Sequence, residues 1–319
     1  MIDDTLPHFL RTRDAALAST DRSLRRRWER GEITRVRSGI YVETQQWLAM
    51  DADSRYRARV AAASNVVALG TQFSHDSAAA LWRLPTIGLW PAHIHVLGGT
   101  SSGPRSRTDI RRHSALLDAH PAQINGVAMT SLASTELDIS RTSRFTRAVA
   151  MADDAMRAPE KGEFRHTHSV PPVTRDQLLD LLGSSQFSSA RVRARRVVEF
   201  ATGRSGSVGE SLSRVQLHGL GIAPPELQVP FFDEDGHIGD ADFYWPELDL
   251  IGEFDGLVKY RDQRYLRGRL PLDAVIAEKQ REDRMRRVVR AFTRWGWATA
   301  MDKARLERHL AAHGLLRTR

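Results

Sequence analysis

Residues 205–256 read SGSVGESLSRVQLHGLGIAPPELQVPFFDEDGHIGDADFYWPELDLIGEFDG, and this stretch decides the architecture of the C-terminal part of the chain. Val208, Leu212 and Val215 recur at helical spacing, so the first part predicts a helix with Glu210 near its start. Three extended segments follow, separated by short Asp-Gly and Pro-Glu turns. This spacing predicts an antiparallel meander of three strands after the helix.

Acidic side chains fall at defined places in this pattern. Asp242 lies in the second segment, whereas Glu253 and Asp255 end the third. Because side chains alternate along a strand, Glu253 and Asp255 share one face. Two carboxylates on one face are costly without a cation, and carboxylate oxygens are the ligands that Mg²⁺ prefers. An ion held there would activate water and neutralise charge on a phosphodiester.

The pattern therefore predicts a Mg²⁺ or Mn²⁺ site for phosphodiester hydrolysis. Glu210, Asp242 and Glu253 are the expected ligands, Asp255 is an additional ligand, and Lys259 is the cationic partner of the phosphate. Asp240 competes with Asp242, because period-two geometry places both on one face. Glu278 or Lys279, in the charged segment that follows, is a candidate to orient the metal ligands by hydrogen bonding to them.

The same residues resemble the PD-(D/E)xK restriction-endonuclease-like superfamily, specifically its very-short-patch repair group. The likeness covers about residues 205–312 and continues through EFDGLVKY and EKQREDRMRRVVRAFTRWGW. It implies an αβββαβ core in which Glu210, Asp242 and Glu253 match the family carboxylates. The family has Lys two residues after the last carboxylate, where this chain has Asp255. Lys259 from the following loop could substitute, or Asp255 could become another metal ligand, and either arrangement is compatible with activity. The departure also fits a scaffold that is retained for binding alone.

The N-terminal residues predict a DNA-binding module. Residues 6–18 form an expected first helix, DRSLRRRWERGE (21–32) a second, and ITRVRSGIYVE (33–43) a two-stranded wing around Ser38-Gly39. A basic second helix beside a wing is typical of winged helix-turn-helix proteins that contact phosphates; the alternative is a solvated basic helix. The expected DNA contacts are Arg22, Arg25, Arg26, Arg27, Arg30, Arg35 and Arg37.

This region resembles actinobacterial proteins with an AbiEi-type antitoxin N-terminal winged helix. The resemblance rests on RRWERGEITRVRSGIYV, FSHDSAAALWRLP, HIHVLGG and GVAMTSLASTELDIS, and it covers roughly residues 5–157. It implies DNA binding, often in autorepression of a toxin-antitoxin operon, with a cognate toxin as a partner.

Histidines in the middle region predict structure rather than chemistry. His93 and His95 alternate on one expected strand and offer two metal ligands, but no third ligand is apparent. His75, Asp76 and Ser77 are consecutive, which does not suit a catalytic triad, so they are interpreted as a helix entry with capping groups.

The composition of the chain excludes several classes of chemistry and of protein. The 319 residues carry a net charge of +8 and no cysteine, which excludes disulfides, thiol catalysis and cysteine-bound metals. The chain shows neither a membrane span nor a signal peptide, so a cytoplasmic protein is expected.

The expected fold is α+β with two principal domains. Their parts are the winged helix (1–50) with a small α+β extension (51–157), a linker with connector helices (158–204), and the restriction-endonuclease-like domain (205–319).

Two functions fit this organisation. The first is a Mg²⁺-dependent DNA endonuclease anchored by the winged helix, for phage defence or DNA repair. The second is an antitoxin-like transcriptional autorepressor with an inactive nuclease-like domain. A third interpretation makes the basic residues incidental and the protein a scaffold. Double-stranded DNA is the expected partner, and a homodimer suits a palindromic site.

Overall fold

The computed structural model describes residues 6–12, 20–68, 70–98, 109–113, 118, 120–124, 126–158, 170–184, 188–256 and 271–315. Within these ranges the protein has a mixed α+β fold with three sheets. The chain divides into two compact units, Met1–Ser143 with Pro159–Arg196 and Arg144–Ala158 with Val197–Arg319. No described helix has the length and apolar character needed to cross a membrane.

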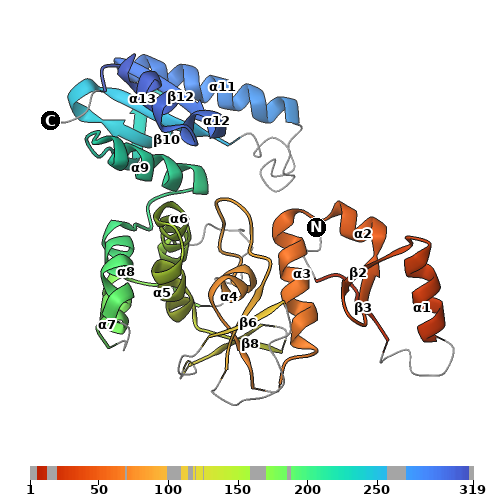
Figure 1. Ribbon diagram of the computed structural model, residues 1–319. Coiled ribbons are helices and arrows are strands. Elements are labelled where there is room, and N and C mark those ends of the chain that lie inside the picture. The colour runs from red at the N-terminus through yellow and green to blue at the C-terminus, as the bar shows by residue number, and fades with distance from the viewer. Residues whose placement is uncertain are drawn as a thin grey trace. The chain divides into compact units, whose positions relative to one another are not determined.

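The first unit begins with a small sheet of order β1-β3-β2. Its elements are β1 (Leu10–Arg11), α1 (Thr20–Glu29), β2 (Ile33–Arg37), β3 (Ile40–Glu43), α2 (Thr44–Ala49) and α3 (Ala52–Ser64). The predicted hairpin is confirmed: β2 and β3 pair antiparallel, and Gly39 in their turn has a left-handed φ of 73°. Figure 1 shows α3 between this sheet and the rest of the first unit.

The helix predicted over residues 6–18 is wrong in its described part. Leu10 pairs with Tyr41 and Arg11 with Ile40, and the Thr12 amide donates to the Gly39 carbonyl at 3.0 Å. The free edge of β3 supplies backbone partners that a short isolated helix lacks, so strand pairing overrides helix propensity. Residues 13–18 lie outside the described residues.

A five-stranded sheet of order β6-β5-β4-β8-β7 forms the centre of the first unit. Its strands are β4 (Gln72–Phe73), β5 (Ile94–Leu97), β6 (Ile110–His113), β7 (Ala122–Ile124) and β8 (Val127–Met129). The accompanying helices are α4 (His75–Leu81), α5 (Leu132–Thr142) and α7 (Arg175–Ser184). The α4 helix is buried along its whole length, and α7 packs on α5.

The second unit holds the predicted helix and meander. Its four strands have the order β12-β11-β10-β9; β10 runs antiparallel to β9 and β11, and β12 runs parallel to β11. The elements that build the sheet are α9 (Val208–Leu220), β9 (Glu226–Asp233), β10 (Gly236–Trp245), β11 (Leu250–Asp255), α11 (Pro271–Val288) and β12 (Ala291–Gly296). The flanking elements are α6 (Phe145–Met156), the 3-10 turn η2 (Pro246–Leu248), α12 (Trp297–Ala300) and α13 (Lys303–Ala311).

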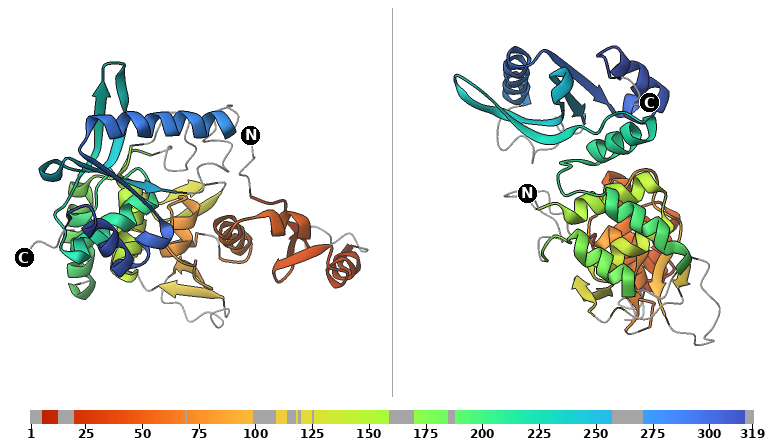
Figure 2. Two further views of the ribbon diagram at one scale, coloured as in Figure 1. Left: turned by 90° about the horizontal axis from the view of Figure 1, so that it is seen from above. Right: turned by 90° about the vertical axis from the view of Figure 1, so that its left-hand side faces the viewer.

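Two helices cover opposite faces of this sheet (Figure 1). On one face, Met285 of α11 packs with Ile251 and Phe292; on the other, α9 brings Gly209 against the ring of Phe254. Trp295 is buried against Phe243, as expected for a packed tryptophan. The β9–β10 hairpin extends beyond the helices of this unit (Figure 2).

The stretch predicted as a linker, residues 158–204, is divided between the two compact units. The α7 helix belongs to the first unit, and α8 (Ser188–Phe200) crosses the division at Arg196. The α6 helix, expected in the N-terminal extension, belongs instead to the second unit, because buried Asp153 accepts hydrogen bonds from Arg214 and Ser211 of α9, each at 2.7 Å.

The α9–β11 contact gives a direct test of the second unit. A methyl group at Gly209 would overlap the Phe254 ring, so Gly209→Ala should lower the free energy of unfolding by about 3 kcal/mol. Gly219 lies on the same helix, where a methyl group would meet only the ammonium end of the Lys303 side chain, at 3.3 Å from Nζ, which donates to the Gly219 carbonyl. Gly219→Ala should therefore be neutral or stabilising by up to about 1 kcal/mol. Urea unfolding of both variants measures the difference, and equal effects would contradict the packing described.

Candidate carboxylate site and nucleic-acid interface

Glu210 caps the helix on which it lies. Ser207 is the N-cap of α9 and accepts from the Glu210 amide at 3.3 Å, while the Glu210 carboxylate accepts from the Gly206 amide at 2.7 Å. The Ser-x-x-Glu spacing is that of a capping box, but the Glu210 carboxylate accepts from the residue before the N-cap and not from the N-cap amide itself; both bonds satisfy backbone donors at the helix start. Glu210 lies in the first turn, as predicted, and is only 4% exposed.

Gln228 connects Glu210 to Asp242. Its side-chain amide donates to Glu210 Oε2 at 2.9 Å and to Asp242 Oδ1 at 3.3 Å. Asp242 Oδ2 accepts from the Phe254 backbone amide at 2.8 Å, just beyond the last register pair of β10 and β11. The φ of Gln228 is 51°, a left-handed conformation that is uncommon for a residue with a side chain. One amide thus lies between the two carboxylates.

Glu253 is held by arginines. Arg281 of α11 donates to both carboxylate oxygens at 2.8 Å, and Arg294 of β12 donates to Oε2 at 2.7 Å. Arg294 is also the register partner of Glu253 in the parallel β11–β12 pair. Glu253 itself is 5% exposed, so both guanidinium groups neutralise a buried charge.

Glu278 shares the same arginines. It accepts from Arg281 and from Arg294, each at 2.9 Å. Burial opposes ionisation of Glu278, but the hydrogen bonds and charges of the two arginines outweigh it and lower the pKa of Glu278. The pKa of Arg281 is raised, because its bonds to both acids outweigh its own burial. Glu278 therefore contacts the same two arginines as Glu253.

The other acidic candidates lie apart from this network. Asp255 ends β11 and is half-buried, on the strand predicted for it. Asp240 is exposed and contacts His237 at 3.1 Å, so the structure associates Asp242, and not Asp240, with Glu210. Lys259 lies outside the described residues.

The carboxylates do not converge as metal ligands. Among the described residues, one set of three or more potential ligand side chains brings its ligand atoms within 4.8 Å of one another, and that set is His75, His95 and His113. Glu210 and Asp242 contact an amide and backbone donors, and Glu253 contacts two guanidinium groups. This arrangement stabilises the sheet and its two covering helices.

The basic helix α1 is partly neutralised by neighbouring acids. Arg25 pairs with Glu29; Arg27 bonds Glu32 and Glu43; Arg30 bonds Glu32. Arg37 pairs with Asp109 at 2.6 Å, and its side chain is only 9% exposed, so it holds β2 to the β6 region and does not reach solvent.

Three of the seven arginines remain exposed and form no salt bridge with any described residue: Arg22, Arg26 and Arg35. Arg35 lies 5.9 Å from the ring centroid of Trp28, which is 44% exposed. Arg22 and Arg26 lie on one face of α1. In the predicted DNA-binding surface, this face carries guanidinium groups that can pair with a phosphate without first leaving a described acidic partner.

The sequence reasoning missed Gln228, Arg281 and Arg294. Gln228 carried one signal, since it is an amide within the apolar run LQVPFF (227–232) of its strand. Arg281 and Arg294 carried no such signal, because the sequence has arginines in many of its expected helices and strands and nothing distinguishes these two.

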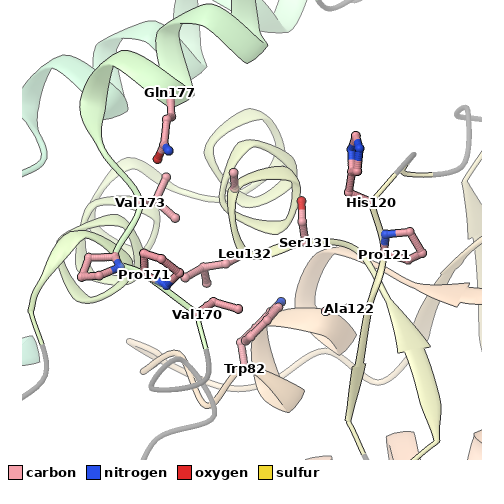
Figure 3. Close-up of a pocket in the computed structure, with 12 residues that line it drawn as sticks. Trp82, His120, Pro121, Ala122, Ser131, Leu132, Val170, Pro171, Val173 and Gln177 are labelled. Atoms are coloured by element: carbon pink, nitrogen blue, oxygen red, sulfur yellow. The ribbon is translucent and has the colours of Figure 1, made fainter.

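A cavity of about 500 Å³ in the first unit offers little chemistry. Figure 3 shows Trp82, Leu132 and Pro171 around it, with His120 and Ser131 at one side. Its lining is mostly apolar, and no cluster of ionisable groups faces it among the described residues. We assign it no catalytic role.

The arginine pairing of Glu253 gives a test of the carboxylate site. Glu253→Gln leaves two partly buried guanidinium groups short of an anion, so it should lower the free energy of unfolding by about 3 kcal/mol. Asp240→Asn, on the exposed part of the same sheet, should change it by less than about 0.5 kcal/mol. Chemical denaturation measures both. A stable Glu253→Gln protein would show that the ion pairs contribute little.

Comparisons with known proteins identify relatives without a known function. No family model matches this chain. Two uncharacterized proteins of Mycobacterium tuberculosis, MT2308 in strain CDC 1551 / Oshkosh and Rv2248 in strain ATCC 25618 / H37Rv, are each 27% identical to it over 135 residues. The match covers 42% of this chain and 45% of each relative, so the chain spans less than half the length of the curated proteins that it matches.

Proposed function

We propose that this protein binds double-stranded DNA through the basic face of α1 and acts as an antitoxin-like regulator, with a nuclease-like second unit that does not cut DNA. The observation that carries the non-catalytic part is the pairing of both Glu253 oxygens with arginines. A cytoplasmic site of action, a homodimer on a palindromic operator and a cognate toxin as partner belong to the same proposal.

The exposed arginines support DNA contact. Arg22 and Arg26 extend from one helix, and the β2–β3 hairpin that follows it fits the wing of a winged-helix module. The first helix of a helix-turn-helix is not seen in residues 6–12. The proposal therefore depends on α1 and the hairpin, with Arg25 contributing when Glu29 releases it.

The order of elements supports a nuclease-like second unit. A helix carrying Glu210, three antiparallel strands carrying Asp242 and Glu253, a long helix and a parallel strand follow one another in the αβββαβ order. Asp255 in place of the family lysine, together with the arginines on Glu253, favours a scaffold that binds without hydrolysis.

Metal-dependent cleavage is the second candidate, and one observation favours it. Glu210 and Asp242 contact the same Gln228 amide, so they already lie on one side of the sheet end. Rotation of that amide would open two carboxylates to Mg²⁺, which takes oxygen ligands and keeps several waters.

The DNA-binding surface predicts a salt dependence. Each arginine on a phosphate adds about 0.9 to the slope of log affinity against log salt, so the double variant Arg22→Gln/Arg26→Gln should reduce that slope by about 2. Fluorescence anisotropy with duplex DNA at several salt concentrations measures it.

Arg30→Gln is the control on the same helix, because Arg30 is already paired with Glu32 at 2.6 Å. It should leave the slope nearly unchanged. If the double variant and the control have the same effect, or the wild type fails to bind at low salt, α1 is not the DNA-binding surface.

The non-catalytic proposal predicts that purified protein leaves duplex DNA intact in Mg²⁺ or Mn²⁺ while still retarding it in a gel. Wild type, Asp242→Asn and Asp240→Asn should all behave alike. Cleavage by wild type and Asp240→Asn, abolished in Asp242→Asn, would reject this proposal in favour of the second candidate. That result would leave DNA binding by α1 unaffected.

A further inference from the structure

Three histidines from separate segments meet in the first unit. His75 begins α4, His95 lies in β5 and His113 ends β6. One ligand atom from each lies within 4.8 Å of the others. His75 and His95 are buried, and His113 is half-buried. The gathering is therefore a product of the fold and not a chance encounter of surface side chains.

The ring nitrogens of His95 and His113 are close to the spacing that a metal requires. His95 Nδ1 and His113 Nε2 lie 2.9 Å apart. Two nitrogen ligands of a tetrahedral Zn²⁺ at about 2.0–2.1 Å are separated by about 3.3 Å. If the two rings turned and the distance grew by a few tenths of an ångström, with the shared proton moved to the other nitrogen of its ring, both lone pairs could face one ion.

His75 has the partner expected of a ligating histidine. Its Nδ1 lies 3.3 Å from Asp138 Oδ2 and 3.0 Å from Ser74 Oγ. When Nδ1–H donates to Asp138, the lone pair is on Nε2 and the tautomer suited to metal binding is fixed. The His75 ring stacks on His113 with centroids 3.7 Å apart, so the third imidazole adjoins the other two.

The surrounding structure holds these rings in place. The His95 amide donates to Ser77 Oγ at 2.8 Å, which ties β5 to α4. His75 has a left-handed φ of 50°, uncommon for a residue with a side chain. Backbone conformations of this kind concentrate at functional sites, where the surrounding contacts maintain them. Here the conformation directs the His75 ring toward Asp138 and His113.

We propose that His75, His95 and His113 form a binding site for Zn²⁺ or a related divalent transition-metal ion. Neutral imidazole is a ligand that zinc, copper, nickel and iron favour, whereas Mg²⁺ favours oxygen. Three protein ligands leave the fourth tetrahedral position for water or a small anion. The ion would link the start of α4 to β5 and β6, and would stabilise the first unit by binding its folded form.

Metal content and thermal stability test the site in the full chain with any purification tag removed. After chelation and dialysis, added Zn²⁺ should bind with a stoichiometry of one per chain by elemental analysis. At about 100 times its dissociation constant it should raise the first unit's melting temperature by about 5 °C or more. His113→Gln, in the half-buried position, should remove both effects.

His93→Gln is the matched control, since His93 is exposed and lies two residues before His95. It should bind Zn²⁺ like the wild type. Asp138→Asn should weaken binding by about 10-fold or more without removing a ligand. Circular dichroism of each zinc-free variant checks that it is folded.

A Co²⁺ titration adds a readout that does not depend on stability. Tetrahedral nitrogen ligation should give the wild type an intense visible absorption, which folded His113→Gln lacks. The proposal is overturned if the wild type takes up no Zn²⁺, or if folded His113→Gln binds it as tightly as His93→Gln.

Discussion

The burial of the Glu253 charge is the constraint on which the second unit depends. A carboxylate that is 5% exposed requires compensation, and Arg281 and Arg294 supply it from two different elements. The same bonds fasten α11 and β12 to β11, with Glu278 completing the balance of charge. The arginines that neutralise Glu253 therefore also connect the sheet to its covering helix. The packing of the unit and the pairing of this carboxylate depend on the same bonds.

The elements of the second unit were predictable because local pattern and tertiary fold agree there. The helical spacing of Val208, Leu212 and Val215 and the Asp-Gly turn at Gly236 each predict the structure that forms. Residues 6–12 were not, since β1 exists only through its pairing with β3, and no local signal announces a two-residue edge strand. A candidate helix there was reasonable from composition and wrong because of a distant partner.

Site residues divide in the same way. The pattern of extended segments and turns correctly placed Asp242 in β10 and Glu253 in β11, since it depends only on local sequence. It could not indicate which cations would meet them, because Arg281 lies on a helix whose i, i+3 and i, i+4 charges look like a solvated face. Of the two histidines considered as ligands, His95 belongs to the cluster and exposed His93 does not, while His75 and His113 were not recognised because only the pairing of β5 with β6 and the packing of α4 bring them to His95. Charge has the same limitation: the net value of +8 does not reveal that Glu32 and Glu43 neutralise part of α1.

The two clusters differ in what a metal ion would have to displace. At Glu253 an ion must replace two guanidinium groups, each bonded to a buried carboxylate, and those cations would then depend on Glu278 and Glu282 alone. Among the histidines an ion displaces the hydrogen bond between the His95 and His113 rings, while Asp138, which also pairs with Arg141, lies beside His75. Binding a divalent ion therefore has a higher electrostatic cost at the acidic residues for which a metal site was predicted than at the three histidines. The composition of the sequence gave no reason to group these histidines.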